Sequence, residues 1–180
     1  MDEDTSAEWV EGEVTFMSPV SLDHQLMAGF LATVIRIYVE QHELGVVLIG
    51  PFYMKLPGYG AQPDVLVILK ENEGRLQETF LDGPADLVVE VISPESVERD
   101  RVKKFDDYQA AGIAEYWLID PERRTAEFYQ LVEGRYELAA TPDDIYASRV
   151  LPGLRLPLEW LRRNSLPPLL DVLRWLGMIA

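Results

Sequence analysis

Apolar and polar positions along the chain predict a regular order of strands and helices. Alternation over residues 9–17 is typical of a half-buried strand that ends at Ser18-Pro19. Apolar residues then recur at helical spacing from Ser21 to about His42 and predict one long helix, with Gly45 as a stop signal. Residues 46–56 and 64–70 are expected to form strands, and residues 75–85 a loop with at most a short helical turn.

A second set of elements is predicted in the remainder of the chain. Residues 87–92 are aliphatic except for Glu90 and lie between two proline-containing breaks, which favours a strand buried on both faces. A helix should begin near Pro94 and end at Gly112. Strands are expected over residues 113–119, 125–131 and 135–140, with a hairpin between the last two. A last short helix follows Pro167-Pro168.

This order predicts an α/β or α+β fold, in which a mixed central β-sheet is flanked by helices. A chain of 180 residues fits one domain with a sizeable core. We expect a disordered N-terminus over residues 1–7 and the folded domain over residues 8–160. Residues 161–180 are expected to form a short C-terminal helical tail that packs on the domain or on a partner subunit.

Composition narrows the classes of function. The absence of cysteine excludes disulfides and thiolate metal sites, and no apolar run is long enough for a membrane span, so we expect a cytoplasmic protein without a signal peptide. The net charge of −15 argues against a protein that coats nucleic acid. It does not exclude a nuclease, since a local basic strip and bound metal cations can offset acidity at the site.

Glu90 is the most informative residue, because it places a carboxylate in a strand that should be buried. Alternation puts Glu90 on the same face as Val88 and Ile92. A buried carboxylate is costly unless it is paired, hydrogen-bonded or bound to a metal. Two interpretations therefore stand: Glu90 belongs to a metal site, or it forms a structural ion pair with Lys104 or Arg101.

Asp64 and Lys104 complete a candidate catalytic group. Asp64 begins the strand before that of Glu90, so the two carboxylates can converge at one end of the sheet if the strands are neighbours. Two carboxylates suit magnesium, which keeps water ligands for a substrate phosphate. Lys104 shares a helix face with Asp100 and Tyr108 and could be aimed at the acids. This set predicts metal-assisted phosphodiester hydrolysis; the alternatives are a strand-entry cap for Asp64 and a solvated surface position for Lys104.

An ordered set of motifs covers roughly residues 8–160. These motifs are Gly12-Glu13, Met17-Ser-Pro19, His24-Gln25, Pro63-Asp64, Asp86-Leu-Val-Val-Glu90-Val-Ile-Ser93-Pro94, Asp100-Arg101-Val-Lys-Lys104-Phe-Asp-Asp-Tyr108, Gly112-Ile-Ala-Glu115-Tyr-Trp117 and Asp120-Pro121. In this combination the chain resembles the Uma-two family, restriction-endonuclease-like proteins of the PD-(D/E)XK nuclease superfamily.

The resemblance implies a restriction-endonuclease-like α/β core with Asp64 and Glu90 as ligands of Mg2+ or Mn2+. In the wider superfamily the catalytic lysine follows the second acid by two residues, and here that position holds Ile92. The family instead suggests a migrated lysine at Lys104, with Lys103 as the neighbour that could be mistaken for it. Glu13 would be an accessory acid near the metal.

We therefore expect a metal-dependent endonuclease that acts on DNA, as a homodimer. The rival from another class is a non-catalytic oligomerising or regulatory module of the same fold, and a third idea is a hydrolase of small phosphate esters. His24 is interpreted as a surface or core-edge residue and not as a ligand. The basic pairs Lys103-Lys104, Arg123-Arg124 and Arg162-Arg163 either follow phosphates or are ordinary solvated positions.

Overall fold

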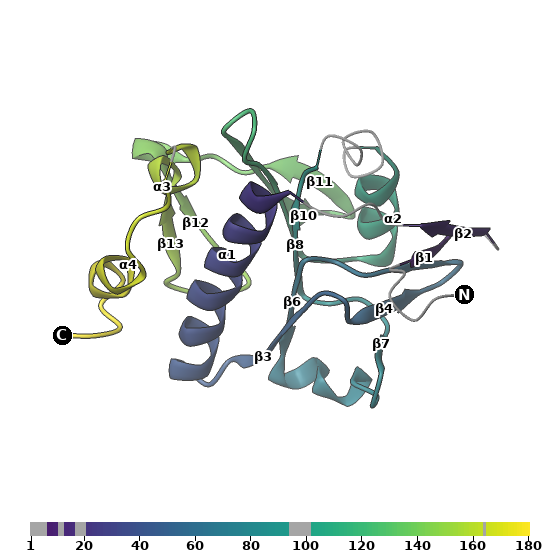
Figure 1. Cartoon of the computed structure of the whole chain (residues 1–180). Helices are drawn as coiled ribbons and strands as arrows, with labels where there is room; N and C mark the ends of the chain where they lie inside the picture. Colours follow the sequence, from purple (N-terminus) through teal and green to yellow (C-terminus); the bar gives the residue numbers. More distant parts are fainter. Residues whose placement is uncertain (1–6, 11–12, 17–20, 94–101, 164) are drawn as a thin grey trace.

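A six-stranded mixed sheet forms the centre of the computed structural model, which describes residues 7–10, 13–16, 21–93, 102–163 and 165–180 (Figure 1). The strand order is β11-β10-β9-β8-β6-β3. Their bounds are β3 Gly45–Ile49, β6 Val65–Leu69, β8 Leu87–Val91, β9 Glu115–Asp120, β10 Thr125–Val132 and β11 Arg135–Leu138. β6 and β8 are aliphatic throughout apart from Glu90, as expected for strands covered on both faces.

β8 and β9 are the parallel pair in this sheet, and the other neighbours are antiparallel. A parallel pair needs a crossover connection, and α2 (Lys104–Ala111) lies in it. Gly112 ends α2 with a left-handed backbone, φ 81°, as its C-terminal cap. The predicted crossing helix and its stop at Gly112 are therefore confirmed, while residues 94–101 of the expected helix lie outside the described part.

α1 (Leu22–Gln41) covers one face of the central sheet, as the long predicted helix should. Ser21 caps its N-terminus, with Oγ accepting from the backbone N–H of His24 at 3.2 Å. The same side carries the C-terminal elements, which are β12 (Ile145–Ala147), β13 (Arg155–Pro157), α3 (Leu158–Arg162) and α4 (Leu169–Trp175). α4 packs on α1, and the rings of Trp160 and Trp175 meet edge to face at 5.1 Å.

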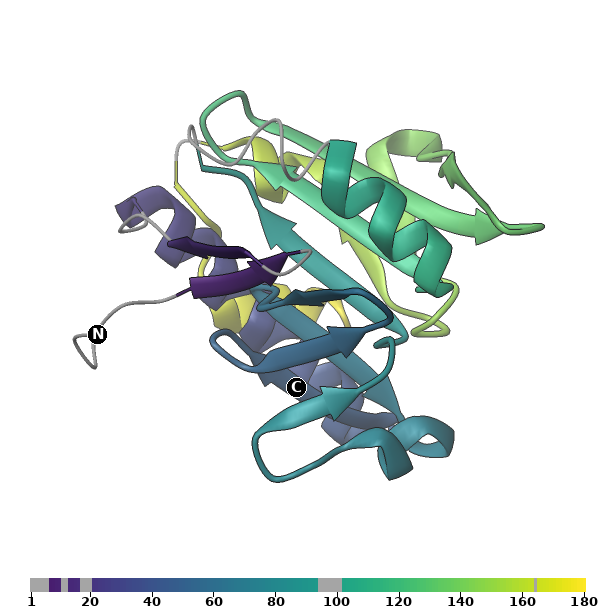
Figure 2. The same cartoon turned by 90° about the vertical axis from the view of Figure 1, so that its right-hand side faces the viewer.

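A second sheet and α2 cover the opposite face (Figure 2). The strand order in this five-stranded sheet is β2-β1-β5-β4-β7. Its strands are β1 Ala7–Val10, β2 Glu13–Phe16, β4 Tyr53–Leu56, β5 Tyr59–Ala61 and β7 Phe80–Asp82. Two apolar cores result: one between α1 and the central sheet, and one between that sheet and the layer of α2 and the second sheet.

Two strand predictions are wrong. Residues 9–17 do not form one strand, because Val10 pairs with Glu13 and the segment is the β1–β2 hairpin. Residues 46–56 are divided into β3 and β4, which belong to different sheets. Gly50-Pro51 lies at the division, and Pro51 has no N–H to continue a ladder.

Several short elements were not predicted from the sequence. They are β5, β7, β12, β13, α3 and the 3₁₀ turns η1 (Lys70–Arg75) and η3 (Pro142–Asp144). Residues 1–7 were expected to be disordered, but Ala7 is the first residue of β1. Residues 1–6 lie outside the described part of the chain. The central sheet, which carries Glu90 and ends beside Asp64, is where prediction and structure agree.

Candidate active site

Asp64 directly precedes β6 and Glu90 lies on β8, and these two strands are neighbours, as the candidate site requires. β6 and β8 are antiparallel with Val65 opposite Val89, so the same register continued by one residue brings Asp64 opposite Glu90. Glu90 shares its face of β8 with Val88 and Ile92, both of which belong to the core beneath α2. The predicted facing of Glu90 is confirmed, and the two acids are brought to the same end of the sheet.

α2 supplies the partners of Glu90. The Lys104 ammonium donates to Glu90 Oε1 at 2.9 Å, and the Tyr108 hydroxyl donates to the same oxygen at 2.7 Å. All three side chains are buried, with residue exposures of 4% for Glu90, 1% for Lys104 and 0% for Tyr108. Lys104 and Tyr108 are one helical turn apart, so they approach the carboxylate from the same helix face.

Tyr108 is held in its neutral, donating form. Burial raises its pKa well above the ordinary value of 10.0, and the neighbouring Glu90 carboxylate raises it further. A phenolate beside a carboxylate would bring two like charges together in an apolar core. The hydroxyl proton therefore stays on Tyr108 and is directed at Glu90.

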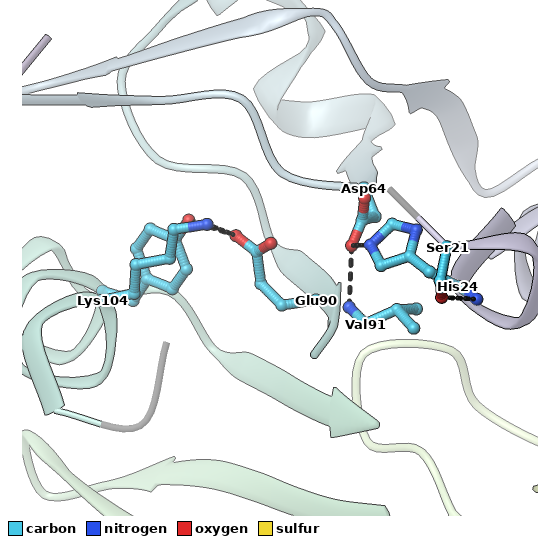
Figure 3. Close-up of polar contacts among 7 residues, drawn as sticks. Ser21, His24, Asp64, Glu90, Val91 and Lys104 are labelled. Atoms are coloured by element: carbon cyan, nitrogen blue, oxygen red, sulfur yellow. Dashed lines mark hydrogen bonds and ion pairs between the residues drawn. The ribbon is translucent and has the colours of Figure 1, made fainter. Parts of the chain in front are cut away.

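Asp64 is held from the other side of the sheet. Its Oδ2 accepts from the backbone N–H of Val91 at 2.7 Å and lies 3.3 Å from Nε2 of His24 (Figure 3). His24 is in the first turn of α1 and is 5% exposed, whereas the Asp64 side chain is 22% exposed. Two helices on opposite faces thus hold the two acids: α1 contacts Asp64 and α2 contacts Glu90.

Of the four residues predicted for the site, Glu90 and Lys104 are in direct contact, and Asp64 accepts from the backbone N–H of Val91, the residue that follows Glu90. Glu13 lies at the start of β2, and its side chain is outside the described part of the chain. Arg101, the other proposed partner of Glu90, is also outside it. Lys103 precedes the first residue of α2, and Lys104, the predicted residue, is in contact with Glu90.

Sequence reasoning did not assign His24 or Tyr108 to this group. The expectation that His24 lies at the surface or core edge is wrong as to exposure, since the side chain is buried beside Asp64. No local pattern could show this, because the contact joins segments forty residues apart. Tyr108 did leave a signal, since it follows Lys104 by four residues on one helix face.

The two acids form a donor set that suits a hard divalent cation. Carboxylate oxygens are the ligands preferred by Mg²⁺, which is commonly bound by one or two carboxylates together with water and substrate phosphate. Within the described residues, no group of three or more His, Asp or Glu side chains is placed to hold a metal ion. A metal held by these two carboxylates would therefore take its other ligands from water and substrate.

Several surface arginines are already paired with acids close in the chain or fold. The described pairs are Arg36–Glu40, Arg123–Asp120, Arg162–Asp144, Arg163–Glu159 and Arg174–Asp171. Two of the basic dipeptides that could have followed phosphates thus contribute arginines to local ion pairs. In the described part of the chain, no helix is both long and apolar enough to cross a membrane.

The central mixed sheet and its flanking helices define a mixed α/β fold. A protein from Anabaena variabilis ATCC 29413, described as a "putative nuclease belonging to DUF820", has this fold: its crystal structure matches with a TM-score of 0.73 and 18% identity, over 87% of this chain and 89% of that one. The chain belongs to the Uma2 (Uma-two) family, whose model is described as "Putative restriction endonuclease" and matches residues 1–159. Among curated proteins, none matches the chain at a significant level.

Proposed function

We propose that this protein is a metal-dependent endonuclease that hydrolyses phosphodiester bonds in nucleic acid. Asp64 and Glu90 would hold Mg²⁺ or Mn²⁺, Lys104 would assist the attacking water, and Glu13 would be an accessory acid. The observation that carries the proposal is the placement of two carboxylates at the same end of neighbouring strands, with a lysine 2.9 Å from one of them. Membership of a family of restriction endonuclease-like proteins supports it.

Each side chain has a physical task in this proposal. When bound, the metal ion supplies positive charge at the scissile phosphate and acidifies water. Val91 and His24 contact Asp64 at Oδ2, while Lys104 and Tyr108 contact Glu90 at Oε1. The Lys104 ammonium, held at the carboxylate, can orient the attacking water and offset the negative charge that develops on the phosphate.

The rival function, a non-catalytic module of the same fold, is favoured by one feature of the same site. Glu90 and Lys104 neutralise each other, with side-chain exposures of 5% and 1%. A structural ion pair would satisfy the buried charges in this way without any chemistry. The local pairing of surface arginines also suits a protein that does not bind a polyanion.

Metal titration separates the two functions. Calorimetric titration of Mg²⁺ and Mn²⁺ into the wild type should detect binding that is lost in both Asp64→Asn and Glu90→Gln. Cleavage of DNA and RNA by the wild type should require the metal and should be lost in Lys104→Met. A folded wild type that binds neither metal, alone or with DNA present, and cleaves neither substrate would support the non-catalytic module.

The finer parts of the proposal concern substrate, assembly and compartment. We propose DNA as the substrate, a homodimer as the working form and the cytoplasm as the compartment. The tail supports the dimer in one respect, since Leu170 and Trp175 of α4 are 57% and 49% exposed although α4 packs on α1. Light scattering of the purified protein would test the dimer, and parallel DNA and RNA substrates would test the choice of nucleic acid.

A further inference from the structure

His24 is a buried polar residue that the proposed chemistry does not use directly. It lies in the first turn of α1, where Ser21 Oγ accepts from its backbone N–H at 3.2 Å. Its side chain crosses to the end of the central sheet and places Nε2 3.3 Å from Asp64 Oδ2. A histidine that only filled the core under α1 would not need this contact with an acid of the site.

Both contacts of the Asp64 carboxylate converge on Oδ2. The N–H of Val91 approaches from β8, and the His24 ring approaches from α1. A single donor leaves a carboxylate able to rotate about that hydrogen bond, whereas two donors from different elements fix both the position of the oxygen and the plane of the group. This matters for Asp64 because its side chain is 22% exposed and is not confined by packing alone.

We infer that His24 is a positioning residue for Asp64: its Nε2–H binds Oδ2 and holds the carboxylate in the orientation that receives the metal. The inference rests on the proposed metal site. Outer partners of metal ligands fix ligand orientation, and losing one commonly costs about 10- to 100-fold in metal affinity. In this inference His24 acts through Asp64, the acid that its Nε2 contacts, and is not itself a metal ligand.

The first test needs no metal. The chain has two histidines, His24 and His42, so a nitrogen-15 histidine spectrum contains two sets of ring signals, which a His42→Gln variant assigns. His24 should carry a proton on Nε2 in the wild type, and its signals should shift in Asp64→Ala while those of His42 stay in place. A His24 ring with an unprotonated Nε2, or signals unmoved by Asp64→Ala, overturns the inference.

The second test measures Mn²⁺ affinity in paired variants. His24→Leu keeps the side-chain bulk but loses the donor, and it should weaken Mn²⁺ binding by about 10- to 100-fold. His24→Gln can present an amide N–H in a similar place and should restore most of the affinity. His42→Leu is the matched control, because His42 is exposed at the other end of α1 and stacks on Tyr38.

The outcomes distinguish this inference from the proposed function. Equal Mn²⁺ affinity in the wild type and a folded His24→Leu overturns the positioning role and leaves the metal site intact. A wild type that binds no metal overturns the proposed function, and the histidine spectrum then decides alone whether His24 positions Asp64. Thermal unfolding of each variant shows whether a loss of Mn²⁺ affinity is due to misfolding. If His24→Leu is misfolded, the Mn²⁺ affinity of His24→Gln is compared with that of the wild type instead.

Discussion

Asp64 directly precedes β6 and Glu90 lies on the neighbouring strand β8, yet helices on different faces of the sheet contact the two side chains. Asp64 Oδ2 is bound by a strand amide and approached by a histidine of α1, and Glu90 Oε1 by a lysine and a tyrosine of α2. Each acid thus has two partners on one oxygen.

The Glu90–Lys104 pair should show strong coupling in a double-mutant cycle. Removing one partner of a buried ion pair leaves an uncompensated charge and costs about 3–5 kcal/mol. We therefore expect Lys104→Met to lower the free energy of unfolding by about that amount, and Glu90→Gln/Lys104→Met to recover much of it. Urea unfolding of the two single variants and the double variant measures this. Additive losses would show that the pair contributes little.

Alkaline pH should unfold the protein in step with tyrosine ionisation. Burial raises the pKa values of Tyr38, Tyr108, Tyr136 and Tyr146 above the ordinary 10.0. In the unfolded chain these tyrosines lose their hydroxyl protons near pH 10.0, whereas in the folded chain the raised pKa values keep the protons on. The stability that the neutral tyrosines contribute is therefore complete below about pH 10.0 and is lost as the pH rises toward the folded pKa values. Tyrosinate absorbance and circular dichroism should therefore change together; ionisation of all tyrosines in a still-folded protein contradicts this.

Glu115 provides a matched comparison for Glu90. It is also a buried strand glutamate, but it belongs to β9 and accepts hydrogen bonds from Trp117, Ser148 and the backbone N–H groups of Arg149 and Val150. A glutamine would turn an NH₂ group toward some of these donors, so Glu115→Gln should cost about 1.5–3 kcal/mol. Denaturant unfolding gives the loss. Metal affinity should stay at the wild-type value, and a change in affinity would show that this cluster supports the site.

Gly153→Ala should destabilise the attachment of the C-terminal segment to α1. Gly153 has φ 93°, and an added Cβ would lie 2.7 Å from the Tyr38 hydroxyl oxygen, which donates to the Pro152 carbonyl. We expect a loss of more than about 1 kcal/mol. Gly134→Ala is the control, since Gly134 has φ 80° and open space around the new Cβ. Similar denaturation midpoints for the two variants would show that the contact of the new Cβ with Tyr38 does not add to the destabilisation.

The central strands were predictable because burial on both faces leaves a plain sequence signature. β6 and β8 are short aliphatic runs between breaking residues, and Glu90 stands out only against that background. Lys104 was within reach of the same reasoning, since a helix after β8 must fold back over the sheet. These inferences depend on the local sequence pattern and on the short segment that connects β8 to α2.

The remaining elements depend on contacts that the local sequence does not encode. β5 and β7 are three-residue strands that owe their conformation to β4 between them. The hairpin at β1 and β2 was hidden because alternation continues across its turn. The contact of His24 with Asp64 was hidden for a similar reason, since it forms only when α1 docks on the finished sheet.

The placement of the two acids between layers has a consequence for partly folded forms of the protein. Detaching α2 would remove the Lys104 and Tyr108 contacts of Glu90, and detaching α1 would remove the His24 contact of Asp64 while the hydrogen bond from Val91 stayed in place. A form that lacks either helix would therefore keep only some of the contacts that fix the two acids. Any activity that needs both acids would depend on both helices being docked.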